Sequence, residues 1–323
     1  MKKIQDNLGR IIKYLRLSIT DGCNLRCRYC MPTTEFSNIP TNELLTYQEF
    51  LRIVKILNGL GIEKIRITGG EPTIREGLVG FVQSLSQLGL NDLAMTTNGI
   101  LLPQLAKKLK KAGLERINIS VDSLREDRYR EITRGGDFER CWTGIKESIK
   151  AGFDPVKLNV VLQKNFNTDE ILDFARLTFE YPLHVRFIEY MSDELESKDD
   201  FFSNETTLEI LNSLAPLERV EVGEKAAGPA DYYQYPDSLG KIGLISPISH
   251  KFCQTCNRIR LAANGKLFLC LGSGRHIDLK RALRQGIGDG ELGKNIQEAI
   301  HKKPVGYQFN KSKLIGKMSS IGG

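Results

Sequence analysis

Three cysteines near the N-terminus have the residue type and the spacing to hold one metal centre. Cys23, Cys27 and Cys30 follow an alternating apolar run over residues 15–20, with the spacing C-x3-C-x2-C. Three thiols this close in sequence cannot all pair as disulfides, but as thiolates they can bind one iron–sulfur cluster. On a four-iron cluster they leave one iron without a protein ligand. Such an iron can bind a small molecule and pass it an electron.

A structural zinc site and three incidental cysteines are the alternatives for this segment. Structural zinc sites usually have four protein ligands, and no fourth cysteine or histidine lies near these three in the sequence. Tyr29 is an aromatic residue directly before the third cysteine. With this aromatic residue, the C-x3-C-x2-C pattern resembles the signature of the radical S-adenosylmethionine (SAM) superfamily, and it favours the cluster.

A second set of cysteines lies near the other end of the chain: Cys253, Cys256 and Cys270. Asn264 and Gly265 predict a hairpin turn that returns the third cysteine toward the first two. The spacing alone leaves two readings equally open. One is a zinc site with His250 or His276 as a fourth ligand, and the other is an iron–sulfur cluster. The presence of the first set favours a second cluster with an open iron.

The glycine-rich stretch at residues 286–295 contains the spacing G-x-G-x-x-G but does not predict a phosphate-binding loop. Both common phosphate-binding motifs follow a strand, whereas this stretch follows a basic helical segment. Asn295 also stands where a P-loop has a magnesium-binding hydroxyl. We expect a helix–loop–helix here.

The pattern of apolar residues predicts six strands that alternate with helices. The expected strands cover residues 15–20, 64–68, 92–97, 116–121, 155–162 and 184–190. Such an alternation is typical of a parallel sheet with right-handed crossovers. Six units are too few to close an eight-stranded barrel. We therefore expect an α/β fold, a partial (βα)6 TIM-like barrel of the radical SAM type, with a smaller C-terminal region that carries the second cluster.

Local signals give more detail on the elements. Thr46 and Glu49 predict a capping box at the start of the first helix. Residues 192–230 are polar and predict an irregular connecting segment. Short strands at 241–246, 258–262 and 266–269 would build the C-terminal region. We expect a core domain over residues 1–215 and an auxiliary-cluster and substrate-binding domain over residues 216–323.

Polar residues gather where the predicted strands end: Cys23, Gly70-Glu71, Thr96 to Asn98, Ser120 to Asp122, and Glu189 to Met191. The carboxyl ends of parallel strands form the face on which such folds place their sites. Each group alone is also compatible with turn chemistry. Five groups at equivalent positions favour one site at this face.

Composition narrows the class of protein. The chain has 323 residues and 41% hydrophobic residues, which is unlike a disordered chain. No apolar run is long enough to span a bilayer, and the N-terminus lacks the apolar segment of a signal peptide. Seven cysteines fit a cytoplasmic protein if six are metal ligands. The net charge of +7 indicates an anionic partner, either a phosphorylated small molecule or nucleic acid.

Several motifs occur in one order along the chain: Thr-Gly-Gly-Glu-Pro, Thr-Thr-Asn-Gly, Ser-Val-Asp-Ser, Arg-Phe-Ile-Glu, Phe-Cys-x2-Cys-Asn-Arg and a final Ile-Gly-Gly. Together with both cysteine sets, they resemble the GTP 3',8-cyclase family. These radical SAM lyases start molybdenum cofactor biosynthesis. The resemblance covers nearly the whole chain. The first cysteine motif specifies only the superfamily, whereas the second set and the Gly-Gly tail specify the family.

The resemblance implies a role for each matching residue. Two [4Fe-4S] clusters would be held by Cys23, Cys27 and Cys30 and by Cys253, Cys256 and Cys270. SAM would contact Tyr29, Gly70, Ser120 and Met191. GTP would contact Arg16, Arg66, Thr96, Lys157, Arg258, Ile259 and Arg260, with Lys64 and Arg186 as weaker candidates. Gly322 and Gly323 would insert into the site as catalytic residues.

The family also implies a reaction. Reduction of the first cluster cleaves SAM to methionine and a 5'-deoxyadenosyl radical, which abstracts the 3' hydrogen of GTP. The ribose radical then attacks guanine C8 and gives (8S)-3',8-cyclo-7,8-dihydroguanosine 5'-triphosphate. The implied partners are an external one-electron reductant, the downstream cyclic pyranopterin monophosphate synthase and a second copy of the chain in a homodimer.

The sequence departs from the family pattern at two places. Gly22 stands where the family often has arginine, and the segment after Met191 lacks a glycine and a tryptophan often found there. Neither change touches the cysteines. Both concern the shape of a loop rather than the reaction.

Two other functions compete with the cyclase. A peptide-modifying radical SAM maturase would have a peptide-binding strand edge and often has more C-terminal cysteines than the three present here. A nucleic-acid-binding iron–sulfur regulator would need a reading helix with clustered basic residues. No such helix is predicted, so we expect neither a nucleic-acid partner nor a membrane partner.

Overall fold

The computed structural model describes residues 3–31, 39–191, 200–223 and 228–306. In these ranges the strands form one sheet, in the order β12-β11-β10-β1-β2-β3-β4-β5-β6-β9-β8-β7. Its centre consists of β1 (Tyr14–Ser18), β2 (Lys64–Thr68), β3 (Asp92–Thr97), β4 (Arg116–Ser120), β5 (Val156–Leu162) and β6 (Leu183–Glu189). Each of these strands pairs in parallel with the next.

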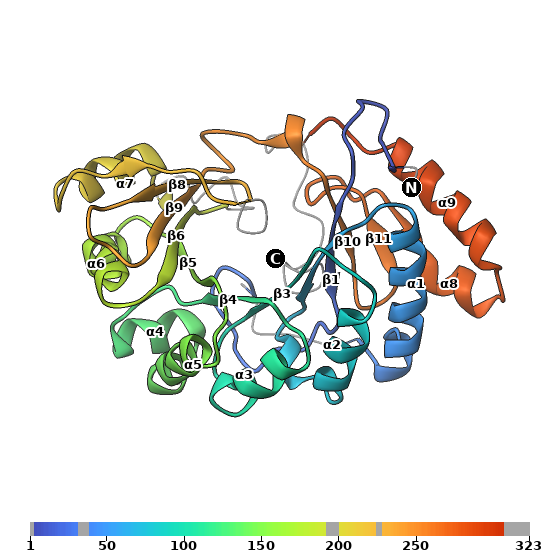
Figure 1. The fold of residues 1–323 in the computed structure, drawn as a ribbon, viewed down its shortest axis with the longest axis horizontal. Coiled ribbons are helices and arrows are strands. Elements are labelled where there is room, and N and C mark those ends of the chain that lie inside the picture. Colours follow the sequence, from blue (N-terminus) through green and yellow to red (C-terminus); the bar gives the residue numbers. More distant parts are fainter. Residues whose placement is uncertain (1–2, 32–38, 192–199, 224–227, 307–323) are drawn as a thin grey trace.

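Helices connect the parallel strands: α1 (Tyr47–Gly59), α2 (Leu78–Ser86), α3 (Leu102–Lys111), α4 (Glu126–Thr133), α5 (Phe138–Lys150) and α6 (Ile171–Glu180). Figure 1 shows the strands as a curved inner wall with these helices on its outer side. The six predicted strand–helix units and the partial barrel are therefore confirmed.

The C-terminal strands extend the sheet at both edges. At one edge, β9 (Lys241–Ile245) pairs in parallel with β6 and continues into β8 (Ala230–Gln234) and β7 (Glu218–Arg219). At the other edge, β10 (Arg258–Leu261) pairs in parallel with β1 and continues into β11 (Lys266–Phe268) and β12 (His276–Asp278). The C-terminal region thus flanks the central strands on both sides, and the proposed boundary at residue 215 stays a prediction.

Local chemistry explains several element boundaries. The predicted capping box at α1 is confirmed, because Thr46 accepts from the Glu49 backbone and Glu49 accepts from the Thr46 backbone. The hairpin between β10 and β11 is also confirmed, and Gly265 has the positive φ of +84° that this turn requires. The expected helix–loop–helix is confirmed for the stretch at 286–295, which begins in the loop after α8 (Leu279–Arg284) and continues into α9 (Asp289–His301).

The expectation of an irregular segment over residues 192–230 is wrong for its middle part. Residues Asn204–Asn212 form helix α7. The Ser203 hydroxyl accepts a hydrogen bond from the Thr206 backbone at 3.1 Å and caps the helix. Thr207 and Leu211 bury one face against the rest of the chain. A short helix with two buried anchors gives too weak a periodic signal to stand out among polar residues.

The core lies between the sheet and the outer helices. Apolar side chains of the central strands, such as Leu15, Leu17, Ile65 and Ile67, are fully buried there. The alternate residues of the same strands face the inside of the barrel. None of the helices in the described part of the chain is long and apolar enough to cross a membrane.

Candidate functional site

The first cysteine set lies in the loop after β1, as predicted. The Cys27 carbonyl accepts from the backbone N–H groups of Cys30 at 3.0 Å and Met31 at 2.9 Å, which makes a tight turn. Cys23 Sγ accepts from the Leu25 backbone at 3.4 Å. Burial raises the pKa of Cys27 well above its usual value, and negative charge on Asp122, Cys30 and Cys23 adds to this rise. The thiols therefore lie close enough to one another to interact electrostatically.

Two glycines allow the next loop to approach this cysteine loop. The Gly70 N–H donates to the Thr20 carbonyl at 2.7 Å, and the Glu71 N–H donates to the Gly22 carbonyl at 2.8 Å. A Cβ atom on Gly70 would lie 2.2 Å from the Gly22 oxygen, and one on Gly69 would lie 2.7 Å from the Thr20 oxygen. Glycine is required here because the two backbones touch.

Glu71 joins the loops that follow β2 and β3. Its buried carboxylate accepts from Thr97 Oγ1 and from the Asn98 backbone, each at 2.7 Å, and from the Thr73 backbone at 3.0 Å. Burial raises the pKa of Glu71, and these hydrogen bonds counteract that rise. Glu71 thus has a structural part in holding two of the predicted polar groups together.

Asp122 connects the first cysteine loop to β4 and β5. Tyr29 donates its hydroxyl to Asp122 Oδ2 at 2.8 Å, and the Val161 backbone donates to Asp122 Oδ1 at 2.8 Å. Burial raises the pKa of Asp122 to about 6. Tyr29, which lies between two of the cysteines in sequence, therefore has a fixed ring orientation.

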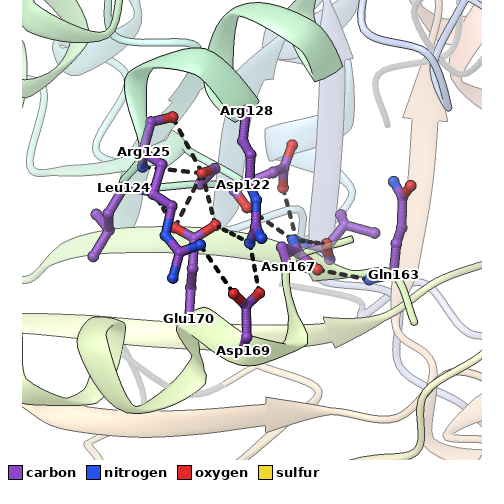
Figure 2. Close-up of polar contacts among 10 residues, drawn as sticks. Asp122, Leu124, Arg125, Arg128, Gln163, Asn167, Asp169 and Glu170 are labelled. Carbon is purple, nitrogen blue, oxygen red and sulfur yellow. Dashed lines mark hydrogen bonds and ion pairs between the residues drawn. The ribbon is translucent and has the colours of Figure 1, made fainter. Parts of the chain in front are cut away.

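A polar network holds the loop after β4 in place (Figure 2). Asn167 donates to the Asp122 carbonyl at 2.8 Å and to the Val161 carbonyl at 2.9 Å. The buried Glu170 carboxylate accepts from Ser123 Oγ at 2.8 Å and from the Leu124 backbone at 2.7 Å. Arg128 then bridges the carboxylates of Asp169 and Glu170. The loop after β4 is thus held by the residues that follow β5.

The second cysteine set surrounds a cavity of about 120 Å³. The walls of this cavity include all three predicted cysteines and several cations: Cys253, Cys256, Cys270, Lys251, Arg258, Arg260 and Lys303. Burial raises the pKa of Cys256, but Arg258 and Lys303 reverse this effect, and the net pKa is lowered. The cavity is therefore suited to thiolates.

The donors of each set are three free thiols, which is a donor set that fits an iron–sulfur cluster. No three cysteine, histidine or acidic side chains of the described residues form a group that could hold one metal ion. A zinc ion draws its thiolates within about 2.3 Å of one point. The irons of a cluster occupy separate corners, so their thiolates stay farther apart.

The two sets lie at opposite ends of neighbouring strands. Cys23 follows the carboxyl end of β1, whereas Cys256 precedes β10, which runs parallel to β1. The antiparallel strand β11 then returns Cys270 to the same end as Cys256. A strand of the length of Tyr14–Ser18 spans roughly 13 Å. A ligand of nucleotide size can therefore lie between the two sets.

Cations occupy the sheet between the two sets. Arg260, Arg16 and Arg66 are direct neighbours on β10, β1 and β2. Burial lowers the pKa of Arg16 well below its usual value, and Arg260 lowers it further. Burial, followed by the charges of Arg186, Arg116 and Arg66, lowers the pKa of Lys157 to about 5. The inner face of the barrel thus concentrates basic side chains.

Several polar atoms on this face have no hydrogen-bond partner among the described residues. They include Arg66 Nε and Thr96 Oγ1, which are both buried. Buried polar groups normally have a partner. A polar ligand on the inner face would supply one.

Sequence reasoning missed several residues of this face. Tyr232 accepts from the Lys157 ammonium at 2.9 Å, and Asn159 accepts from Arg186 at 3.0 Å. Asp92 forms a buried ion pair with Arg116. Every second residue of β4 and β5 faces the barrel interior. This alternation could have identified Arg116 and Asn159 as inward-facing residues from the sequence. No sequence pattern identified Tyr232, because its strand β8 is connected to the central strands only through β9.

The remaining predicted site residues lie at several separate places in the fold. Ser120 ends β4 and Thr96 lies on β3 beside Asn118. The Ile259 side chain packs in the hydrophobic core, so a ligand contact there would use its backbone. Met191 lines the cavity of the second cysteine set. Gly322 and Gly323 lie outside the described residues.

Comparisons with known proteins agree with this arrangement. The model of the radical SAM superfamily matches residues 17–178, and the model named Molybdenum Cofactor Synthesis C matches residues 183–309. The GTP 3',8-cyclase of Alkaliphilus oremlandii is 51% identical over 285 residues, which cover 87% of this chain and 88% of that protein. The GTP 3',8-cyclase of Pelotomaculum thermopropionicum is 45% identical over 99% of this chain and 100% of that protein.

A solved structure supports the fold independently. Streptococcus suis SuiB bound to S-adenosylmethionine matches with a TM-score of 0.65 at 14% identity, over 90% of this chain and 66% of that one. This likeness concerns the fold alone. The family itself follows from the matching family models and the long, similar relatives: the chain belongs to the GTP 3',8-cyclase family of radical SAM enzymes in molybdenum cofactor biosynthesis.

Proposed function

We propose that this chain converts GTP to 3',8-cyclo-7,8-dihydroguanosine 5'-triphosphate with SAM as the radical source. The observation that carries the proposal is the row of cations between two cysteine sets. Arg260, Arg16 and Arg66 lie side by side at the centre of this row. A nucleoside triphosphate has the charge for such a face and the length to reach from one set toward the other.

The inner-face cations would bind the triphosphate. Arginine forms paired hydrogen bonds with phosphate oxygens, and these bonds are strong because both partners are charged. Arg66 Nε and Thr96 Oγ1 are buried atoms that such a ligand would satisfy. Lys157 would add a proton-dependent charge, since its pKa of about 5 would rise next to phosphate. These residues would hold the ribose in one orientation and exclude water.

The first cysteine set would hold a [4Fe-4S] cluster through Cys23, Cys27 and Cys30. When bound, this cluster supplies the electron that splits SAM and starts the radical chemistry. Tyr29, Gly70 and Ser120 would contact SAM. The contacts among Gly70, Gly22 and Thr20 hold the SAM-binding loop against the cysteine loop.

The second set would hold another [4Fe-4S] cluster through Cys253, Cys256 and Cys270. Met191 lies on the wall of this cavity, and its proposed contact with SAM would require that SAM extends toward the second set. Arg258 and Arg260 line the same cavity, and Arg260 belongs to the row of cations. They would orient the nucleotide toward the second cluster.

The remaining expectations rest on the family. We propose catalysis in the cytoplasm by a homodimer that takes electrons from an external reductant and passes its product to cyclic pyranopterin monophosphate synthase. Gly322 and Gly323 are proposed to enter the site. Deletion of both should abolish product while both clusters remain, and full activity after the deletion would contradict their role.

The proposed function is tested by SAM cleavage in the absence of oxygen. The full chain is reconstituted with iron and sulfide, reduced with dithionite and given SAM with or without GTP. We expect 5'-deoxyadenosine formation to depend on GTP in the native chain and to fall strongly in Arg16→Met. Lys302→Met, at an exposed position directly after α9, is the control. SAM cleavage that proceeds equally with and without GTP would contradict GTP as the substrate.

A further inference from the structure

Lys303 is a buried cation at the second cysteine set. Its side chain is only 2% exposed, and it lines the cavity together with the three cysteines. The ammonium donates to the Arg258 carbonyl at 2.9 Å and also to the Leu269 carbonyl. Arg258 lies two residues after Cys256, and Leu269 lies directly before Cys270. One side chain therefore joins the two segments that carry these cysteines.

The segment around Lys303 also approaches Cys253, the remaining cysteine of this set. Arg10 donates to the Cys253 carbonyl at 2.7 Å, to the Pro304 carbonyl at 2.7 Å and to the Val305 carbonyl at 3.0 Å. A Cβ atom on Gly306 would lie 3.2 Å from Cys253 Sγ. Asp6 pairs with Arg10 and fixes its guanidinium. Residues 303–306 are thus tied to all three cysteine segments.

Burying an ammonium is costly unless negative charge or good hydrogen bonds compensate it. Lys303 forms two hydrogen bonds to carbonyl groups. Burial lowers the pKa of Lys303, and negative charge on Cys256 and Cys270 counteracts this effect. No carboxylate forms an ion pair with Lys303 among the described residues. The structure thus places the charge of Lys303 next to the thiolates.

We propose that Lys303 positions Cys256 and Cys270 for the second cluster and stabilises the reduced state of that cluster with its buried charge. This inference rests on the proposed function, because it assumes that the second set holds a cluster. A positive charge beside a cluster favours the addition of an electron, and net charge and hydrogen bonding are among the factors that set cluster potentials. Removal of the charge should make the potential more negative.

The test uses the full chain with Cys23, Cys27 and Cys30 replaced by alanine, so that only the second cluster is observed. Three substitutions separate charge from hydrogen bonding. Lys303→Met loses both, Lys303→Gln keeps a donor without charge, and Lys303→Arg keeps both. Lys302→Met is the matched control, because its side chain is exposed. Each variant is reconstituted anaerobically. Its midpoint potential is measured by a redox titration followed by EPR, and its iron loss is measured in the presence of a chelator.

We expect a more negative potential in both Lys303→Met and Lys303→Gln, and iron loss that is several times faster in Lys303→Met. Lys303→Arg and Lys302→Met should remain near the parent. If Lys303→Met does not accumulate as a soluble protein, the comparison between Lys303→Gln and Lys303→Arg decides the role of the charge. An unchanged potential in every uncharged variant would overturn the inference, as would a Lys303→Arg variant as impaired as the uncharged variants.

The parent protein separates this inference from the proposed function. A parent that binds no four-iron cluster at the second set would contradict the proposed function itself. A parent with a normal cluster and uncharged Lys303 variants that behave like it would contradict only the role of Lys303.

Discussion

Buried cations on the inner face of the sheet carry an electrostatic cost that an anionic ligand would remove. Lys157 is 1% exposed and lies beside Arg186 and Arg116, and its amino group donates a hydrogen bond to Tyr232. Its pKa of about 5 means that Lys157 is largely neutral at pH 7 without a ligand. A triphosphate close to Lys157 would raise this pKa. Binding would then be coupled to the uptake of a proton.

This coupling predicts a pH dependence for GTP binding. Between the pKa of about 5 and the higher pKa of the complex, binding takes up a proton, so affinity should fall as the pH rises. Calorimetry in buffers with different ionisation enthalpies measures the uptake. Lys157→Met should abolish it and weaken binding about tenfold or more, the size expected for a lost hydrogen bond to a charged group.

The exposed Lys164 offers a matched control for Lys157. Lys164→Met should leave both the affinity and the proton uptake unchanged. Proton uptake that persists in Lys157→Met would contradict the assignment of the titrating group.

The hydrogen bond between Tyr29 and Asp122 predicts a second effect at the level of single residues. Tyr29→Phe and Asp122→Asn should each weaken SAM binding several-fold, because a typical hydrogen bond contributes about 1 kcal/mol. The iron content of the first cluster should stay unchanged. Equilibrium dialysis with labelled SAM measures the affinity. The double variant should lose less than the sum of the single losses, because both changes break the same bond.

Tyr181→Phe is the control for this pair, since Tyr181 packs against Trp142 and precedes β6, at the end of the sheet opposite the first cysteine set. Additive losses in the double variant would show that Tyr29 and Asp122 act separately, against the prediction.

At the level of elements, the loops after β1 and β2 form one unit. Gly70 touches the backbone of Asp21 and Gly22, and a Cβ atom there would lie 2.2 Å from a carbonyl oxygen. Neither backbone can move away from the other without breaking hydrogen bonds, because bonds of 2.7 Å and 2.8 Å join the two loops. The cysteine loop therefore depends on a residue far from it in sequence.

Substitution of Gly70 tests this dependence. Gly70→Ala should separate the two loops, lower the melting temperature and reduce the iron bound by the first set. Gly80 in α2 is the matched control, because a Cβ atom there meets nothing within 4 Å. Gly80→Ala should instead stabilise the chain by about 0.5–1 kcal/mol, the usual gain in a helix. Thermal unfolding and iron analysis compare the two. Equal iron content in both variants would contradict the account.

Sequence patterns predicted the elements that have strong local signals. The six strand–helix units follow from regular apolar periodicity, and the capping box of α1 follows from two side chains three positions apart. No local pattern predicted that β9 and β10 join opposite edges of the sheet. These strands have only four or five residues, and their partners β6 and β1 lie far away in the sequence. For the same reason, the partnership of Tyr232 and Lys157 was not predicted, although Lys157 itself was.

At the level of the whole molecule, we propose that the two cysteine sets and the cations form one site. The first set follows β1 and the second surrounds the start of β10, the parallel neighbour of β1. We predicted five polar groups at the carboxyl ends of the strands, and all five lie there. The second set lies at the opposite end of its strand. Because of this, the substrate is expected to lie between the two sets, along the barrel interior.

The central claim is that a radical formed at the first set takes the 3' hydrogen of a GTP molecule held between the two sets. The most direct measurement uses GTP with deuterium at the 3' position, in the reconstituted and reduced full chain with SAM. The account predicts 5'-deoxyadenosine that carries deuterium, formed only when GTP is present, together with the cyclised triphosphate. Unlabelled 5'-deoxyadenosine, formed equally with and without GTP, would contradict it.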